Sequence, residues 1–383
     1  MARWVMLLLA WCFAGCASPP VVINSDHLFA DALFKPPTVT IAAEEVLRLS
    51  PAMRSFLRHD IGAGAQRRAP NLVLLDALYT RNQLKLRYDT TMTRNAVEAF
   101  DARAGNCMSL VIMTAAFARE LGLPVRYQSV YTDPNWGRRG NLYFTIGHIN
   151  LSVGRPRDLT RAFGDSADWV TVDFLPQRDL LGQRFQVIEE PTLIAMYMNN
   201  KAAEALSAGQ LDDAYWWIKA ALQQDKQLLF AYNTLGVIYQ RHGNLAQAEQ
   251  TLRFALARDP DSVQVVGNLA QLLTDQGRST EAQPLFARLA RLQPDPPFKF
   301  FELGRTAMQQ GEYRQAKALF ERELARDPDY HEFHFWLALA YLKLGDSGRA
   351  ARHLAAARDN SNSGEEEALY AAKLARLKAE TVH

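Results

Sequence analysis

Cys107 lies at the predicted start of a buried helix. It follows Asn106, a residue type that often caps the first turn, and precedes apolar residues at helical spacing over 110–121, which end at Gly122 and Pro124. At a helix N-terminus the unpaired amide groups and the helix dipole favour thiolate over thiol. Because the thiolate is the nucleophilic form of cysteine, this position suits nucleophilic catalysis near neutral pH.

Two later segments offer a base and an acid. Residues 146–153 alternate so that His148 points away from the apolar side of a predicted strand, and the alternation of residues 169–174 does the same for Asp173. In a catalytic triad the histidine takes the thiol proton, and the aspartate orients the imidazole and stabilises its cation. The three residue types therefore predict a triad of Cys107, His148 and Asp173.

Other interpretations of these three residues remain open. The triad could be an inactive relic, or the arrangement could be chance. Cysteine, histidine and aspartate also ligate zinc, but no two of these residues are closely spaced as metal ligands usually are. His331 and His334 resemble a ligand pair, yet they open a repeat helix and we expect them to face solvent. We therefore expect no metal and no cofactor.

The surrounding residues resemble the bacterial transglutaminase-like superfamily of papain-type cysteine enzymes. The resemblance covers roughly residues 89–176 and rests on Gly-Asn-Cys-Met-Ser at 105–109, Phe-Ala-Arg-Glu-Leu-Gly-Leu-Pro-Val-Arg-Tyr-Gln at 117–128, Gly-His-Ile-Asn-Leu at 147–151 and Trp-Val-Thr-Val-Asp at 169–173. It implies an α+β papain-like domain over 41–190, with Cys107 as nucleophile, His148 as base and Asp173 as orienting acid. The interval between His148 and Asp173 is longer than a short hairpin, so Asp168 is the alternative acid.

Composition limits the classes of protein. A chain of 383 residues with 48% hydrophobic and 22% charged residues can form two or three packed domains. Its net charge is +2 and it has no long basic run, which argues against a nucleic-acid partner.

The N-terminus carries a predicted targeting segment. Arg3, an apolar stretch at 4–13 and small residues before Cys16 are typical of a secretory signal that is too short to span a membrane stably. The segment resembles a bacterial lipoprotein signal, which implies removal of residues 1–15 and a lipid on Cys16. The alternative is an ordinary signal cut after Ala17.

The lipoprotein interpretation has two further consequences. Residues 16–40, rich in Pro, Ser and small side chains, would be a tether to a membrane, which we expect to be the periplasmic face of the outer membrane. Cys12 would be removed and Cys16 modified, so Cys107 would be the free thiol in an oxidising compartment. Such a thiol cannot form a disulfide within the chain, which raises the odds that it is reactive.

A 34-residue repeat follows. Glycine recurs in phase at Gly209, Gly243, Gly277, Gly311 and Gly345. The period and the accompanying Leu, Ala and Pro positions resemble tetratricopeptide repeats (TPRs), which implies an all-α solenoid of five units over 195–364 and a capping helix over 365–383. A protein or peptide is the expected ligand of its concave groove. The candidate partner-binding residues are Asn199, Asn233, Arg241, Phe301 and Arg305.

Two segments allow alternative interpretations. The aromatic run 215–217 of the first unit could dock on the catalytic domain or could pack between repeats. Residues 132–140 contain turn-forming residues and are predicted to be a loop between two strands. This loop could overhang the site with Trp136 and Arg138, or it could be a solvated hairpin tip.

Two functions follow from this organisation. The first is an envelope-anchored thiol enzyme acting on amide bonds of a protein or peptide, with hydrolysis favoured over cross-linking and with the TPRs recruiting the substrate or a partner. The second is a non-catalytic, membrane-tethered TPR scaffold with a relic transglutaminase-like domain.

Overall fold

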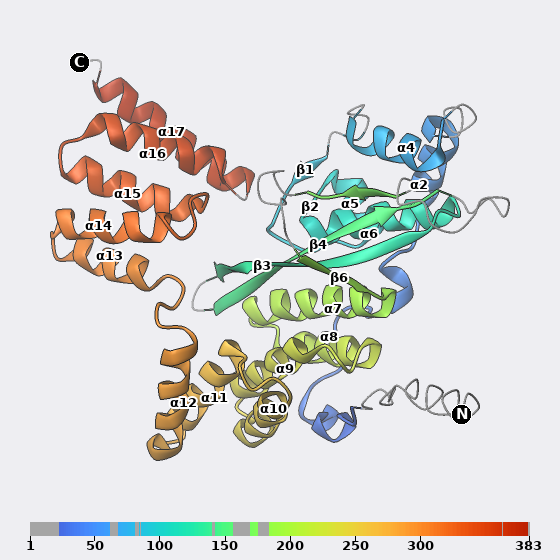
Figure 1. Ribbon diagram of the computed structural model, residues 1–383, viewed down its shortest axis with the longest axis horizontal. Helices are drawn as coiled ribbons and strands as arrows, with labels where there is room; N and C mark the ends of the chain where they lie inside the picture. Colours follow the sequence, from blue (N-terminus) through green and yellow to red (C-terminus); the bar gives the residue numbers. More distant parts are fainter. Residues whose placement is uncertain are drawn as a thin grey trace, which may run out of the picture.

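The described strands all lie in the first part of the chain, together with several helices, and the rest of the described chain is helical (Figure 1). The computed structural model describes residues 23–61, 68–80, 84, 86–139, 142–155, 169–174, 184–361 and 363–381. A mixed α and β part comes first and a long series of paired helices follows. This order confirms the predicted fold class at the level of an α+β part followed by an all-α series of helix pairs.

The α+β part combines short helical turns, one long helix and two sheets. Its helical elements are η2 (Asp26–Leu28), η3 (Asp31–Leu33), η4 (Ala43–Glu45), α2 (Pro51–Phe56), η5 (Leu57–Ile61), α4 (Pro70–Leu75), η6 (Asp76–Thr80), α5 (Ala96–Ala102) and α6 (Cys107–Glu120). Its strands are β1 (Arg87–Tyr88), β2 (Ala104–Gly105), β3 (Val125–Arg139), β4 (Leu142–Val153), β5 (Val170–Val172) and β6 (Arg184–Ile188).

The larger sheet is antiparallel, with strand order β5-β4-β3-β6. The prediction of a loop at 132–140 is wrong, because residues up to Arg139 belong to β3. The pairing of β3 with β4 shifts register between Val130 and Asn135. Such an irregularity allows a segment that contains proline to remain within a pair of antiparallel strands. The side chains of Trp136 and Arg138 lie outside the described part of the chain.

Helix α6 is the central element of this part. Asn106 caps it by accepting the Ser109 backbone N–H at 2.9 Å, and the residues from Cys107 to Ala118 are all buried. The helix packs against β4, β3 and α5, and the side chains of Ile149, Leu151 and Val153 share its hydrophobic core. These three residues are the apolar side of β4 that the sequence predicted.

The helical part consists of five antiparallel pairs and a final helix. The pairs are α7 (Glu190–Ser207) with α8 (Leu211–Gln224), α9 (Leu229–His242) with α10 (Leu245–Arg258), α11 (Val263–Asp275) with α12 (Ser279–Leu292), α13 (Lys299–Gln309) with α14 (Tyr313–Leu324), and α15 (His331–Lys343) with α16 (Ser347–Asp359), followed by α17 (Gly364–Thr381). The in-phase glycines have φ between 76° and 89°, which explains their recurrence at the turn inside each pair.

The five pairs form two stacks and not one continuous solenoid (Figure 1). One hydrophobic core runs from the α+β part to Ala282 in α12, and a second begins at Phe298. Leu303 of α13 is 49% exposed, whereas the leucines at the same position of other units are 0–1% exposed: Leu235, Leu269 and Leu337. Phe298, just before α13, has φ of 61°, which a bulky side chain rarely adopts. The joint at 293–298 is therefore open.

The segment 23–38 is not a free tether. The Phe34 ring stacks on the Tyr215 ring with centroids 4.0 Å apart, and the Tyr215 hydroxyl accepts the Ala30 backbone N–H at 2.9 Å. The Tyr239 hydroxyl donates to the Leu28 carbonyl at 2.7 Å. Proline and serine predict little regular structure, but Leu28 and Phe34 supply apolar surface that the first two helix pairs bury. The prediction of a tether over 16–40 is wrong for these residues.

The aromatic run of the first pair docks mainly on this N-terminal segment. The Trp216 indole N–H donates to the Lys35 carbonyl at 2.6 Å, while the Trp217 ring packs edge-on against Tyr197 of α7. It is α7 that joins the α+β part, since α7 packs against β3 and its Glu190 accepts hydrogen bonds from Arg119 and Tyr127. No helix in the described part of the chain is both long and apolar enough to cross a membrane. The predicted signal and Cys16 lie outside the described residues.

Candidate functional site

The position of Cys107 depends on close packing at the start of α6. The side chain is buried and the thiol is free. Residue 105 must be glycine here, because a Cβ on Gly105 would lie 2.6 Å from the Ser109 Cβ. β1 pairs in parallel with β2, and Tyr88 is the partner of Gly105 in that pairing. The turn before the helix is therefore held between β1 and the first turn of α6.

His148 and Asp173 lie together on adjacent strands. The His148 Nε2 is 2.7 Å from Asp173 Oδ1, and the Asn150 side-chain amide donates to Asp173 Oδ2 at 2.7 Å. β5 pairs with β4 so that Val172 lies opposite Leu151, which brings Asp173 beside Asn150. Both the His148 and Asp173 side chains are buried, at 6% and 7% exposed. The alternative acid, Asp168, lies outside the described residues.

The His148 imidazole also lies beside Cys107, close enough for the charges of the two side chains to interact. Since Nε2 faces the carboxylate, Nδ1 is the ring nitrogen left for the sulfur. Burial lowers the pKa of His148, but the interactions with Asp173 and Cys107 and the charges of both residues outweigh it and raise the pKa to about 9. The raised pKa favours the protonated imidazole at neutral pH. The structure therefore places Cys107 beside a hydrogen-bonded pair of His148 and Asp173.

Tyr88 is a site residue that the sequence analysis missed. Its hydroxyl lies close to the backbone amide and the side chain of Cys107. Tyr88 as a whole is 48% exposed, but its hydroxyl is shielded from water next to Cys107; this desolvation, followed by the charge on Cys107, raises the pKa of Tyr88, so it stays a neutral donor. β1 is too short to show a periodic pattern, and only its pairing with β2 reveals that Tyr88 reaches the cysteine. The hydroxyl lies next to the amide that would receive an oxyanion.

The predicted partner-binding residues in the helical part differ in how accessible they are to a partner. Phe301 is fully buried among the rings of Phe298, Phe320 and Phe333, so its prediction as a partner contact is wrong. The repeat pattern alone does not show whether a phenylalanine at this position faces the groove or the core, because that depends on where the neighbouring unit lies.

Two of the predicted partner-binding residues, Asn199 and Asn233, form hydrogen bonds between neighbouring repeats. Asn199 accepts a hydrogen bond from the Thr234 hydroxyl at 2.9 Å, and Asn233 accepts one from the Asn268 side-chain amide at 2.8 Å. The Arg305 guanidinium lies 5.4 Å from the Trp336 ring centroid, and Arg241 is exposed.

The histidines of the fifth pair were misassigned in part. His331 is buried, and its Nδ1 lies 2.8 Å from the Tyr370 hydroxyl of α17, so the expectation that it faces solvent is wrong. His334 Nδ1 lies 3.0 Å from His353 Nδ1. Across the described ranges no three His, Cys, Asp or Glu side chains are grouped as metal ligands would be.

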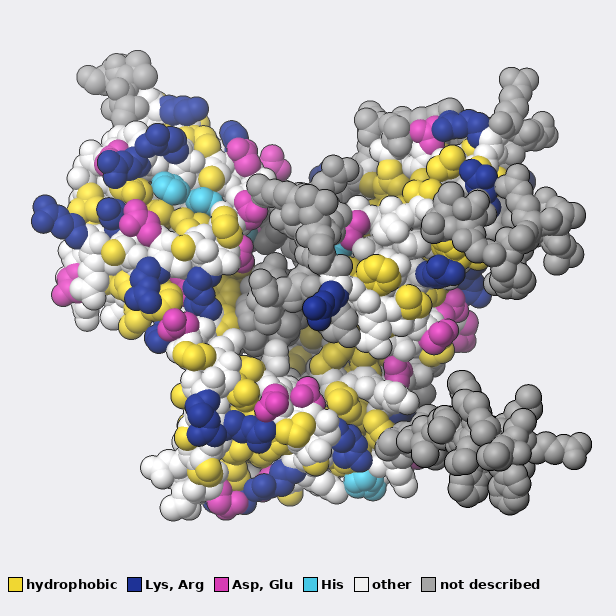
Figure 2. Space-filling model, viewed as in Figure 1, with side chains coloured by type: hydrophobic (Ala, Val, Ile, Leu, Met, Phe, Trp, Pro, Cys, Tyr) yellow, Lys and Arg dark blue, Asp and Glu magenta, His cyan; other side chains and the backbone are white. Residues whose placement is uncertain are grey.

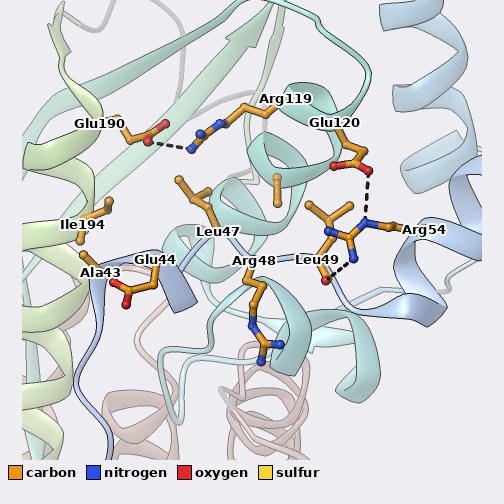
Figure 3. Close-up of a pocket in the computed structure, with 11 residues that line it drawn as sticks. Ala43, Glu44, Leu47, Arg48, Leu49, Arg54, Arg119, Glu120, Glu190 and Ile194 are labelled. Atoms are coloured by element: carbon orange, nitrogen blue, oxygen red, sulfur yellow. Dashed lines mark hydrogen bonds and ion pairs between the residues drawn. The ribbon is translucent and has the colours of Figure 1, made fainter.

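A groove of about 590 Å³ lies at the other end of α6 (Figure 3). Four of its charged side chains form two pairs: Arg54 lies 3.2 Å from Glu120, and Arg119 lies 2.7 Å from Glu190. These opposite charges satisfy each other, and the groove contains no residue of the Cys107 group. We assign it no chemistry.

Comparison with known proteins divides the chain in the same way. Residues 64–174 match the transglutaminase-like superfamily, and residues 239–299 and 301–365 match tetratricopeptide repeat families. A TPR repeat-containing protein of Pseudomonas aeruginosa is 34% identical over 97 residues, which are 25% of this chain. The chain spans only 16% of that relative's length.

Two solved structures are similar to part of this chain. The pilF protein of Pseudomonas aeruginosa has 22% identity and a TM-score of 0.30, over 49% of this chain and 85% of that one. YrrB, described as a TPR protein with an unusual peptide-binding site, has 21% identity and a TM-score of 0.25, over 47% of this chain and 92% of its own.

Proposed function

Because the chain carries a transglutaminase-like domain followed by tetratricopeptide repeats, we propose that it is a thiol enzyme acting on amide bonds of a protein or peptide. The observation that supports this best is the 2.7 Å hydrogen bond between His148 and Asp173 beside the free thiol of Cys107. A cysteine, an imidazole and an orienting carboxylate are the parts that cysteine acyl transfer requires.

Each side chain has a role in this reaction. The Cys107 sulfur attacks the amide carbonyl carbon, and the resulting oxyanion replaces the Tyr88 oxygen at the Cys107 backbone N–H, where it accepts hydrogen bonds from that N–H and from the Tyr88 hydroxyl. The imidazolium of His148 gives its proton to the leaving amine as the C–N bond breaks, which leaves a thioester on Cys107. Asp173 holds the imidazole in place throughout.

The acceptor determines the product. Water, deprotonated by His148, releases a carboxylic acid, whereas a second amine gives a cross-linked product. We favour hydrolysis because it requires no second binding site. The repeats would recruit the substrate or a partner. On the face shown in Figure 2, basic and acidic side chains are intermixed, which suits a protein ligand better than a nucleic acid.

We also propose that the protein is a lipoprotein of the cell envelope, on the periplasmic face of the outer membrane. The support is the signal-like segment that precedes Cys16 and the presence of Ala17 after that cysteine. Cys16→Ser should release the folded protein from the membrane fraction. A variant that stays in that fraction would contradict the lipid anchor.

The enzyme proposal can be tested on natural proteins. Purified Cys107→Ala protein, cross-linked in cell envelopes, should retain its substrate, which mass spectrometry identifies. The wild-type protein should then cleave or cross-link this substrate, and the Cys107→Ala and His148→Ala variants should not. If the wild-type protein leaves the retained partner unchanged, the chain is better described as a tethered scaffold.

A further inference from the structure

Helix α7 is connected by hydrogen bonds to both ends of α6, directly at one end and through a loop at the other. The two helices run antiparallel, so the last turn of α6 meets the first turn of α7, where Arg119 donates to Glu190 at 2.7 Å (Figure 3). At the other end, α7 reaches the start of α6 through residues 89–95, the loop between β1 and α5. A helix counted among the repeats therefore also contacts the element that carries Cys107.

The first step of this second connection is at Thr93. Its backbone N–H donates to Glu204 Oε1 at 2.5 Å, and its carbonyl accepts from Lys201 Nζ at 3.4 Å. Lys201 and Glu204 pair with each other at 3.1 Å. Thr93 is only 2% exposed, although its neighbour Met92 is 44% exposed, so the two α7 side chains hold the one buried residue of this loop.

The second step runs from Thr93 to the start of α6. The Thr93 hydroxyl oxygen accepts from the Asn106 side-chain amide at 3.1 Å. The carbonyl oxygen of the same Asn106 side chain caps the helix, accepting the Ser109 backbone N–H at 2.9 Å and the Ser109 hydroxyl at 2.8 Å. Arg94, next to Thr93, donates its backbone N–H to that hydroxyl at 2.8 Å. Asn106 is the residue immediately before Cys107.

This connection borders a cavity of about 410 Å³ between the α+β part and the first helix pair. Met92, Lys201, Glu204, Tyr197 and Trp217 are among its lining residues. Lys201 and Glu204 are each 22% exposed, so their contact with the loop is not sealed inside a core. A contact of this kind can break without unfolding the domain.

We propose that Lys201 and Glu204 of α7 are positioning residues for Cys107, acting through Thr93 and Asn106. The proposal rests on the thiol-enzyme function given above. Without the contact to Thr93, the Asn106 side chain is free to turn and the first turn of α6 loses part of its cap. Cys107 is the first residue of that turn, and small displacements of a reacting atom cost large factors in rate. The first repeat helix is thus part of the site.

The test compares two glutamates of the same helix. Glu204→Ala removes the contact to Thr93, and the matched control Glu190→Ala removes the contact to Arg119 at the other end of α7. The measurement is the rate of Cys107 alkylation by iodoacetamide between pH 5 and 10 in the full chain, with the melting temperature recorded alongside. We expect Glu204→Ala to slow alkylation at pH 6 by about tenfold and to move the profile to higher pH. Glu190→Ala should lower the melting temperature but leave the profile in place.

Two further variants sharpen the result. Glu204→Gln keeps an oxygen that can accept the Thr93 N–H, so it should restore most of the alkylation rate. If Glu204→Ala does not fold, Thr93→Val removes only the hydroxyl that holds Asn106 and should shift the profile in the same direction.

The outcomes separate the two proposals. A wild-type profile in folded Glu204→Ala or Thr93→Val, or an equal shift in Glu190→Ala, would overturn the positioning role while leaving the enzyme proposal intact. A wild-type thiol that reacts no faster than free cysteine at pH 6 would overturn both.

Discussion

At His148, burial and hydrogen bonding act in opposite directions. Burial alone would favour the neutral imidazole, but the Asp173 carboxylate and Cys107 lie close enough to favour the cation. The balance sets which role the residue can play first. A protonated His148 is an acid for the leaving amine, and it becomes a base only after it has given up that proton.

This balance can be measured at the residue itself. An NMR titration of the His148 ring should show a midpoint near pH 9, well above the ordinary 6.5, and Asp173→Asn should lower it because a charge and a strong acceptor are lost. His148→Gln assigns the signal among the eight histidines. The raised pKa means that this group stabilises the fold fully below about pH 6.5 and that this contribution is lost as the pH rises through about 9. A wild-type midpoint at 6.5 would contradict the raised pKa of His148.

At the scale of elements, the sequence predicted α6, the alternation of β4 and the pairing of helices, because each has a strong period over many residues. It did not predict Tyr88, because a two-residue strand has no period and reaches Cys107 only through pairing between distant segments. It placed a loop at 132–140 since proline and glycine usually end strands, yet the irregular register keeps residues 132–139 in β3.

The start of α6 gives a prediction at this scale. Gly105→Ala should destabilise the protein by roughly 1–3 kcal/mol, because the new Cβ would lie 2.6 Å from the Ser109 Cβ and must displace the first turn. Gly147→Ala in β4 is the control, since nothing lies within 4 Å of its added Cβ. Urea unfolding measures both. Equal stability of the two variants would mean that the turn before α6 is looser than the structure indicates.

At the scale of the whole molecule, the first three helix pairs, segment 23–38 and the α+β part share one hydrophobic core. The repeat period predicted the pairs but could not reveal this sharing, because it describes contacts between neighbouring units only. It also could not reveal the open joint. The same leucine position occurs in four units, and its burial depends on whether the preceding unit is in place.

The joint makes a specific prediction about stability. Leu269→Ala should cost about 2–5 kcal/mol because that side chain is fully buried, whereas Leu303→Ala should cost less than about 1 kcal/mol because half of its surface is already exposed. Chemical unfolding of the two variants, with Leu337→Ala as a buried reference in the second stack, provides the comparison. A Leu303→Ala cost equal to that of Leu269→Ala would show that the joint is closed in solution.

The central claim is that Cys107 and His148 form an activated pair, and the rate of Cys107 alkylation by iodoacetamide tests it most directly. Free cysteine ionises near pH 8.5, so little of it reacts at pH 6. We predict that Cys107 in the wild-type chain reacts much faster than free cysteine at pH 6, and that His148→Ala removes this advantage. Cys107→Ser supplies the background from the remaining cysteines. A wild-type rate that rises only near pH 8.5 would contradict the account.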